Sequence, residues 1–409
     1  MEYIAGKNYL REIFSKYWSG YAEWFKGEIR EAVKENVEKM LKCRTPQLGF
    51  HEYRCPHCNT VRLVPHSCKS RFCNSCGKIM TDNWSEERLT EILKVGYHHL
   101  VFTLPWQLRA IILINRKTML NLLFISVKKS ILDWTSAHGY TPGLYIILHT
   151  YGSDIKFNVH FHVIITSGGI SIDGKKWIES QGGYLMPEEG LKKRWRYNVI
   201  HQMILANNKG LLEMPILKKT GKRINIRGLI SVISKLQWYV YIGACLLEIG
   251  MTVKYVGRYT KKPVLAETRI KHYDSKWVIF SYKDYSNGSK KKVKKMRLYN
   301  FMTHLTNHIA DKYFRIVRGY GIFSNRTKGE MLSRAKELIG DKTAIKSKEK
   351  KSWRERQIDR TGKDPLLCEK CQSAMILVYS CFHLEESHFS KLRIDSPWTI
   401  IPSVQFDSG

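Results

Sequence analysis

The segment Lys156–Thr166, KFNVHFHVIIT, constrains the fold more than any other stretch of this sequence. It is rich in β-branched and aromatic residues and lacks proline and glycine, which is typical of a buried β-strand. Because side chains alternate across a strand, His160 and His162 point to one face and Phe161 to the other. Two neighbouring imidazoles can bind a metal ion, since neutral imidazole is a ligand at neutral pH. The alternative is a half-buried strand that carries two histidines without a metal.

A second predicted strand, at 144–150, precedes this segment and is separated from it by a turn around Gly152. The two strands and their short connection predict an antiparallel hairpin. If the hairpin pairs His149 near His160, the His149 side chain lies on the same face as the two histidines. We therefore take His149 as the candidate third metal ligand, with Asp154 behind it. A surface position at the end of the strand is the alternative for His149.

Hydrophobic periodicity predicts the other regular elements. The first forty residues are expected to be helical, and residues 342–360 are mostly polar and are expected to form a linker. Further helices are expected at 82–95, 116–137, 187–206, 230–236 and 301–318, and further strands at 97–103, 236–241, 277–282 and 291–298.

Six of the ten cysteines lie between residues 43 and 76. Cys55 and Cys58 form one C-x2-C knuckle, and Cys73 and Cys76 form a second one after fourteen intervening residues. The spacing predicts that the two knuckles complete one tetrahedral zinc shell. We expect one or two structural zinc ions, because further candidate ligands lie outside the knuckles: Cys43, Cys68, His51 and His66.

A third knuckle, formed by Cys368 and Cys371, lies near the C-terminus. A full zinc shell there would need two more ligands, for which Cys381 with His383 or His388 are candidates. The sequence favours the absence of a metal at this knuckle over its presence.

The charge balance points to a polyanionic partner. Lys and Arg number 68 against 36 Asp and Glu, which gives a formal net charge of +32. Such a surface attracts nucleic acid, and the 22 Tyr and 11 Trp suit stacking on unpaired bases; a generally basic protein is the alternative. The strand expected at 291–298 is mostly Lys and Arg and could follow a phosphate backbone, or could be a solvated edge strand. Lys69 and Arg71, in the knuckle region, are candidates for phosphate contact.

No signal peptide is visible, and the apolar runs are too short to span a membrane. We therefore expect an intracellular protein, in which cysteines serve better as metal ligands than as disulfides. The chain lacks the Gly-Lys-Ser/Thr of a phosphate-binding loop, so ATP-driven activity is not expected.

A tyrosine pair lies on a predicted short helix that Thr252 could cap and Pro263 would end. Tyr255 and Tyr259 are four residues apart, so their hydroxyl groups lie on one face. Such a pair usually serves packing. Its surroundings here are cationic, and they suit contact with DNA: Lys254, Arg258, Lys261 and Lys262.

Phosphodiester transfer is the chemistry that joins these parts. A divalent cation on the histidines would act as a Lewis acid and orient the scissile bond. Imidazole ligands suit manganese, although magnesium can serve. A tyrosine hydroxyl, whose ordinary pKa is about 10, needs a cationic environment to attack phosphorus. The phosphotyrosine product keeps the bond energy, so the strand could pass to another end without ATP.

The sequence resembles the two-tyrosine transposases of rolling-circle insertion sequences, the IS91 type, within the HUH endonuclease superfamily (histidine, hydrophobic residue, histidine). The resemblance runs from about residue 43 to residue 375. It rests on the order and spacing of these motifs: Cys43–Pro46 with Gly49 and His51; Ser67–Cys68 with Arg71, Cys73 and Cys76; Val101–Pro105; His149–Thr150 with Gly152; Asn158–His162; Tyr255–Tyr259; Tyr320–Ser324; and Asp364–Cys368 with Cys371.

This resemblance implies an α+β fold, in which an HUH endonuclease domain with a central antiparallel sheet flanked by helices follows a small zinc-binding domain. It implies nicking of single-stranded DNA at transposon ends through a 5′-phosphotyrosine intermediate. It assigns His160 and His162 to a catalytic Mg²⁺ or Mn²⁺ and Tyr255 and Tyr259 to nucleophilic attack. A prokaryotic, cytoplasmic protein that joins the nucleoid when bound to DNA is expected, with no membrane partner.

The expected domains follow the chain in order: a helical segment (1–42), the zinc-binding domain (43–95), the HUH nuclease domain (96–325), and a basic linker with a C-terminal knuckle (326–409). Two alternatives remain. A rolling-circle replication initiator or relaxase also combines a histidine pair with tyrosine, but the N-terminal cysteine frame favours the transposase. A non-catalytic zinc protein that binds nucleic acid would leave the histidine pair and the tyrosine pair as coincidences.

Overall fold

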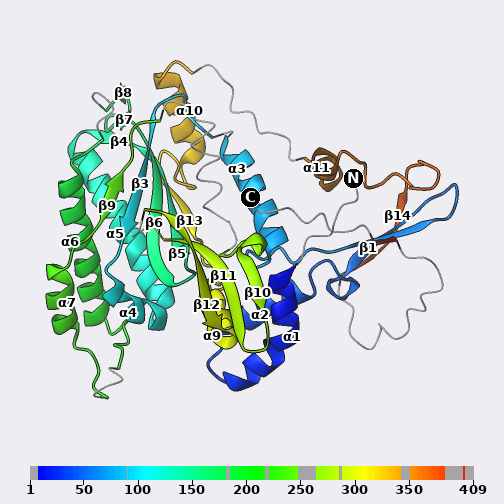
Figure 1. The fold of residues 1–409 in the computed structure, drawn as a ribbon. Helices are drawn as coiled ribbons and strands as arrows, with labels where there is room; N and C mark the ends of the chain where they lie inside the picture. Colours follow the sequence, from blue (N-terminus) through cyan, green and yellow to red (C-terminus); the bar gives the residue numbers. More distant parts are fainter. Residues whose placement is uncertain are drawn as a thin grey trace. The chain divides into compact units, whose positions relative to one another are not determined.

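A computed structural model describes residues 8–89, 91–180, 185–216, 221–246, 264–284, 288–341, 351–382 and 399–400. The chain forms two compact units, each discontinuous in sequence (Figure 1). Unit 1 contains residues 1–82, 261–309 and 347–409, and unit 2 contains residues 83–260 and 310–346. The sequence predicts contiguous domains, whereas residues 264–309 group here with the cysteine-rich unit.

Unit 2 is built on an antiparallel sheet with the strand order β13-β5-β6-β3-β9. The predicted hairpin is formed by β5 and β6, and His149 lies directly opposite His160 in it. The central antiparallel sheet expected from the sequence is thus confirmed. The strands are β3 (Tyr97–Thr103), β5 (Gly143–Tyr151), β6 (Phe157–Thr166), β9 (Val240–Ile242) and β13 (Val317–Gly321).

Helices cover one face of this sheet, as Figure 1 shows. The strand residues that point to this face are apolar, and Phe161 packs edge-on against Phe124, with ring centroids 5.0 Å apart. Trp195 is fully buried there and donates its indole N–H to the carbonyl oxygen of Thr103 at 3.0 Å. The covering helices are α4 (Arg109–Ile114), α5 (Arg116–Ala137), α6 (Glu188–Asn208) and α7 (Ile226–Lys235).

A second, smaller core lies on the opposite face and contains residues of α10 (Lys328–Leu338). Phe323 stacks on Tyr145 there, with ring centroids 4.9 Å apart. Gly321 has a left-handed backbone (φ +58°), and a Cβ at that position would lie 1.8 Å from the carbonyl oxygen of Pro142. Only glycine fits this crossing of two chain segments. A small sheet of β4 (Tyr140–Thr141), β7 (Gly169–Ser171) and β8 (Trp177–Ile178) completes the unit.

Unit 1 holds two further sheets, β14-β1-β2-β15 and β10-β11-β12. Its helices include α1 (Tyr9–Trp24) and α2 (Glu31–Leu41), which confirms the expected helical N-terminal segment. The other elements are α3 (Asn74–Leu89), which begins in this unit, α9 (Leu298–Thr306), α11 (Trp353–Thr361), β1 (Phe50–Arg54), β2 (Val61–Pro65), β10 (Ile270–Tyr273), β11 (Trp277–Asp284), β12 (Lys290–Arg297), β14 (Ile376–Cys381) and β15 (Thr399–Ile400).

Several predicted elements differ from the structure for identifiable reasons. The helix expected at 301–318 ends at Thr306, and its last residues form β13, because they complete the sheet edge beside β5. The helix expected at 82–95 begins at Asn74, inside the second cysteine knuckle. The strand expected at 236–241 is limited to β9 at 240–242. The linker expected at 342–360 contains α11, whose N-terminus has a capping box between Ser352 and Glu355.

None of the helices within the described residues combines the length and the apolar character that crossing a membrane requires.

Candidate active site and zinc sites

Three histidines from the β5–β6 hairpin converge on one face of the unit 2 sheet. A ring nitrogen from each of His149, His160 and His162 lies within 4.8 Å of the others. His149 and His162 are buried and His160 is half-buried, so the strands hold the rings in place. Three imidazoles at this separation fit the donor set of a divalent cation that keeps other positions open. The predicted third position, His149, is thus brought together with the pair.

Hydrogen bonds orient the imidazole rings. The Nδ1 atom of His160 lies 2.9 Å from the carbonyl oxygen of Asn158. The carbonyl can only accept, so Nδ1 of His160 carries the proton and Nε2 has its lone pair available for a metal. The side-chain oxygen of Asn158 in turn accepts a hydrogen bond of 3.1 Å from Arg109. Asp154, expected behind the site, pairs with Lys156 at 3.3 Å and lies outside the histidine cluster.

His99, on the neighbouring strand β3, contacts the cluster and was not predicted from the sequence. Its Nε2 atom lies 2.8 Å from Nδ1 of His162, and the two rings are parallel within 3°. If Nε2 of His162 binds a metal, its Nδ1 carries the proton and donates to His99. Strand alternation places His99 on the same face as Val101. Val101 pairs with His162 across β3 and β6, and this register brings His99 to the histidine cluster.

Burial keeps these histidines neutral. Loss of hydration lowers the pKa of His162, and the nearby rings of His149, His160 and His99 lower it further. Burial also lowers the pKa of His160 and of His99. Neutral imidazole is the form that binds metal, so the fold favours ligation.

The predicted nucleophiles lie outside the described residues. Tyr255 and Tyr259 belong to the segment 247–263, as do the four cations expected around them: Lys254, Arg258, Lys261 and Lys262. Their roles stay predictions.

The first cysteine cluster of unit 1 contains Cys43, Cys68, Cys73 and Cys76. Cys76 lies 3.6 Å from Cys43 and 3.6 Å from Cys68, and Cys73 lies 3.9 Å from Cys43, measured between sulfur atoms. A tetrahedral zinc ion with Zn–S bonds of about 2.3 Å separates its sulfur ligands by about 3.8 Å. Four thiols at these distances therefore fit structural zinc.

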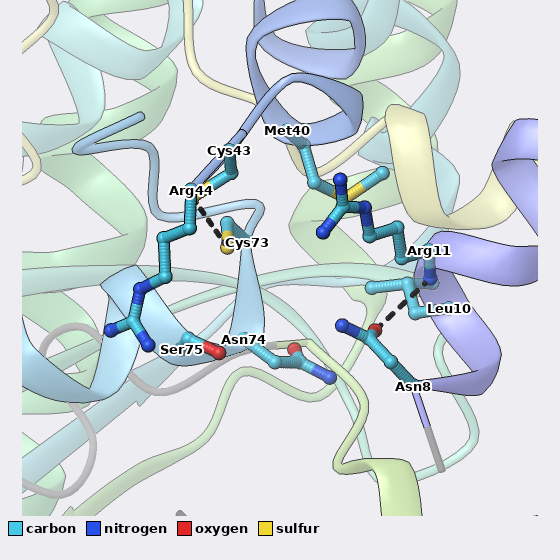
Figure 2. Close-up of a pocket in the computed structure, with 9 residues that line it drawn as sticks. All are labelled: Asn8, Leu10, Arg11, Met40, Cys43, Arg44, Cys73, Asn74 and Ser75. Carbon is cyan, nitrogen blue, oxygen red and sulfur yellow. Dashed lines mark hydrogen bonds between the residues drawn. The ribbon is translucent and has the colours of Figure 1, made fainter. Parts of the chain in front are cut away.

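Figure 2 shows the surroundings of this cluster, with Cys43 and Cys73 pointing toward each other beside a small pocket. Arg11 of α1 closes part of the pocket and donates a hydrogen bond of 2.7 Å to the carbonyl oxygen of Leu41. The loop after Cys68 carries the predicted phosphate contacts. Lys69 is exposed there with a left-handed backbone, and Arg71 is half-buried.

The predicted pairing of the knuckles is wrong. Cys55 and Cys58 do not join Cys73 and Cys76, but form a second cluster with the C-terminal knuckle Cys368–Cys371. Pairing of β1 with β14 brings the N-terminal and the C-terminal knuckle together, and the spacing of the cysteines in the sequence does not predict that pairing.

The other candidate zinc ligands lie outside both cysteine clusters. His51 contacts Ser380 through Nδ1 at 2.8 Å and packs against His66, with ring centroids 4.6 Å apart. Cys381, expected to support the C-terminal knuckle, packs with Phe50 and Leu63 instead. Its expected co-ligands, His383 or His388, lie outside the described residues.

Comparison with known proteins identifies both parts of the chain. A family model described as "Putative transposase" matches residues 143–330, and one described as "Transposase zinc-binding domain" matches residues 13–104, which include the first cysteine cluster. A protein named "Putative transposase y4qJ" from Sinorhizobium fredii is 27% identical over 379 residues, which is 91% of this chain and 95% of that protein. The transposase for insertion sequence element IS801 from Pseudomonas savastanoi pv. phaseolicola is 29% identical over 336 residues, 81% of this chain and 80% of its own length.

No solved structure matches the chain significantly. The two family models match separate parts of it in the expected order, the zinc-binding domain first, and together they cover more than half of its length. The two relatives extend the similarity over most of the remainder. The chain therefore belongs to the IS91-type transposases, with an N-terminal zinc-binding domain followed by the transposase domain.

Proposed function

We propose that this transposase nicks single-stranded DNA at the ends of its transposon and transfers the strand by a rolling-circle route, through a 5′-phosphotyrosine intermediate. The convergence of His149, His160 and His162 on one sheet face carries this proposal, because it supplies a preformed set of neutral ligands. Family membership favours this route over a replication initiator, a relaxase or a non-catalytic zinc protein.

The histidine cluster would hold a catalytic Mg²⁺ or Mn²⁺. When bound, such an ion supplies Lewis acidity to a phosphate oxygen and orients the scissile bond. The chain keeps the ligand set ready in advance. The carbonyl oxygen of Asn158 fixes the ring of His160, and His99 fixes the ring of His162. Preorganised ligands need no rearrangement when the DNA arrives, which lowers the barrier to the chemical step.

Tyr255 or Tyr259 would supply the nucleophile. The phenol oxygen attacks phosphorus and loses its proton, a new O–P bond forms, and the bond from phosphorus to the 3′ oxygen breaks. The leaving 3′ oxygen takes up a proton and becomes a free hydroxyl group, so no oxidant, reductant or nucleotide is needed. One phosphodiester replaces another, which keeps the bond energy for the transfer step without ATP. The other of the two tyrosines would hold a second strand.

A basic face on β12 would help to hold the DNA. Lys291, Lys295 and Arg297 occupy odd-numbered positions of this strand, so their exposed side chains share one face of the β10-β11-β12 sheet. Trp277 pairs with Arg297 on that face, and the ammonium group of Lys295 lies 4.7 Å from the Trp277 ring centroid. Cations beside an aromatic ring suit a single strand, which offers both phosphates and bases.

A denaturing gel tests the covalent chemistry. Purified protein is mixed with end-labelled single-stranded DNA that spans a transposon end, with Mn²⁺ or with chelator. We expect a covalent protein–DNA band that requires the metal. The band should persist in Tyr313→Phe, a control at an exposed tyrosine, and should be lost when Tyr255 and Tyr259 are both phenylalanine.

Two results would contradict the proposal. One is a covalent band in the double tyrosine variant, which would place the nucleophile elsewhere. The other is tight binding without any covalent band on either transposon end, with Mn²⁺ or with Mg²⁺, which would leave only DNA binding.

A further inference from the structure

Two cysteine knuckles from opposite ends of the chain have the same backbone conformation. In the first, the N–H of Asn59 donates to the carbonyl oxygen of Cys55 at 3.0 Å, and the N–H of Cys55 donates to that of Thr60 at 2.9 Å. In the second, the N–H of Gln372 donates to the carbonyl oxygen of Cys368 at 2.8 Å, and the N–H of Cys368 donates to Ser373 at 2.9 Å.

The residue after each knuckle also matches. Asn59 has φ +53° and Gln372 has φ +59°, so each bends the chain back through the left-handed region. Neither residue is glycine, so the left-handed conformation is unfavourable for each of them and the surrounding structure must offset its cost. Two segments that are far apart in the sequence adopt the same unfavourable backbone conformation at the residue after a cysteine pair. This indicates that the two knuckles have the same function.

The two knuckles face each other through their sulfur atoms. Cys55 lies 3.4 Å from Cys371, and Cys58 lies 3.5 Å from Cys368 and 3.6 Å from Cys371. These distances are too long for a disulfide, which is about 2.05 Å, and are close to the sulfur separations around a tetrahedral ion. All four residues are free thiols, and Cys55 and Cys368 are fully buried.

Polar groups contact two of the four sulfur atoms. The backbone N–H groups of Cys371 and Lys370 donate to the sulfur atom of Cys368. The hydroxyl oxygen of Thr60 lies 3.1 Å from the sulfur atom of Cys58. Thiolate is the form that binds metal, and an all-sulfur set of four favours zinc.

Contacts within the protein also hold the two knuckles together. Strand β1 pairs along its length with β14, as Figure 1 shows. The buried guanidinium group of Arg62 on β2 donates to the carbonyl oxygens of Pro365 at 2.6 Å and Leu367 at 3.1 Å. It also pairs with Glu369 at 2.9 Å. These contacts place the C-terminal knuckle beside the N-terminal one.

We propose that Cys55, Cys58, Cys368 and Cys371 bind a second structural zinc ion. The two knuckles and the strands β1, β2 and β14 then form a zinc ribbon assembled from both ends of the chain. It is separate from the zinc site at Cys43, Cys68, Cys73 and Cys76, and half of its ligands lie beyond residue 330, where the matched family models end. Its role is to tie the C-terminal segment to the unit that contains the zinc-binding domain, whatever the chemistry of the histidine cluster.

Zinc content of the purified full-length protein tests this site. Elemental analysis of the wild type should give two zinc ions per chain. The double variant Cys368→Ser, Cys371→Ser should give one. Cys381→Ser is the matched control, because Cys381 is a buried cysteine on β14 outside both clusters, and it should keep two. One zinc ion in the wild type, or two in the double variant, would overturn the proposal.

A conservative variant guards against a loss of zinc through misfolding. Cys371→His can still donate a ligand atom, so it should keep two metal ions and change one site from four sulfur ligands to three sulfurs and one nitrogen. With Co²⁺ in place of zinc, the visible ligand-field bands of one site should shift, while those of Cys381→Ser should match the wild type. A Cys371→His spectrum identical to the wild-type spectrum, at two ions per chain, would exclude Cys371 as a ligand.

Discussion

His99 and His162 lie on neighbouring strands with their rings edge to edge in nearly one plane, the centroids 5.1 Å apart and the planes parallel within 3°. The 2.8 Å contact between His99 Nε2 and His162 Nδ1 leaves the opposite nitrogen of His162 to face His149 and His160. A histidine that ligates a metal usually donates its second N–H to such an acceptor. His99 is therefore a positioning residue for the proposed metal site.

Removal of the acceptor at His99 should weaken Mn²⁺ binding. His99→Phe keeps a flat ring but cannot accept a hydrogen bond, and we expect an affinity loss of roughly 10–100-fold. His99→Gln keeps an acceptor and should retain most of the affinity. Titration calorimetry with Mn²⁺ measures both, and His201→Gln on α6 serves as the control. Equal affinities for the Phe variant and the wild type would rule out this role.

The pH dependence of Mn²⁺ binding should show the depressed pKa values of the histidines. Burial lowers the pKa of His160 and His162, so protonation competes with the metal only at a pH well below the ordinary value of about 6.5. Affinity should therefore change little between pH 7.5 and pH 6, and should fall in more acidic solution. Binding isotherms across this range test the sign. A steady fall that begins near pH 7 would contradict it.

Gly321 should tolerate no side chain. Gly321→Ala places a Cβ against the carbonyl oxygen of Pro142 in a left-handed backbone. Gly174 is the matched control, because its backbone is also left-handed (φ +72°) but a Cβ there meets nothing within 4 Å. We expect Gly174→Ala to destabilise by about 1–2 kcal/mol and Gly321→Ala by about 3 kcal/mol or more. Scanning calorimetry compares the melting temperatures, and equal decreases would show that the contact with Pro142 can relax.

The basic face of β12 should contribute to DNA affinity. The double variant Lys291→Ala, Lys295→Ala removes two exposed cations of that face. If both contact phosphates of a single strand, the slope of log affinity against log salt should decrease in magnitude by about 1.4. Fluorescence anisotropy with a labelled oligonucleotide measures this slope. The control pair Lys26→Ala, Lys34→Ala removes the same charge from the helical segment of unit 1, and an equal effect there would indicate a general charge effect.

Local pattern was enough to predict much of unit 2. The strand 97–103 and the helix 116–137 were predicted with their observed bounds, because each has a clear hydrophobic period and defined ends. The hairpin of β5 and β6 followed from two β-rich runs and a short turn, and its register placed His149 opposite His160. A hairpin turn limits which residues can meet, so the sequence offered His149 as a candidate ligand, and the structure supplied the register.

Pairing between strands that are far apart in the sequence determined the contacts that local sequence pattern did not predict. His99 reaches His162 only because β3 pairs with β6, and residues 317–321 form a strand only because β5 has a free edge there. The cysteine knuckles show the same division. Each C-x2-C loop is a local structure that its spacing predicts, but pairing of β1 with β14 chooses its partner some three hundred residues away.

The sequence by itself determined the local ligand units of this protein: the histidine pair on one strand face, the cysteine knuckles and the class of the regular elements. Their geometry depends on backbone periods that a few neighbouring residues fix. Only the tertiary structure decided how these units combine, which placed Cys55 with Cys368 and His99 with His162. The physical reason is that strand pairing between distant segments is selected by burial and hydrogen bonding over the whole fold, and no short stretch of sequence contains that information.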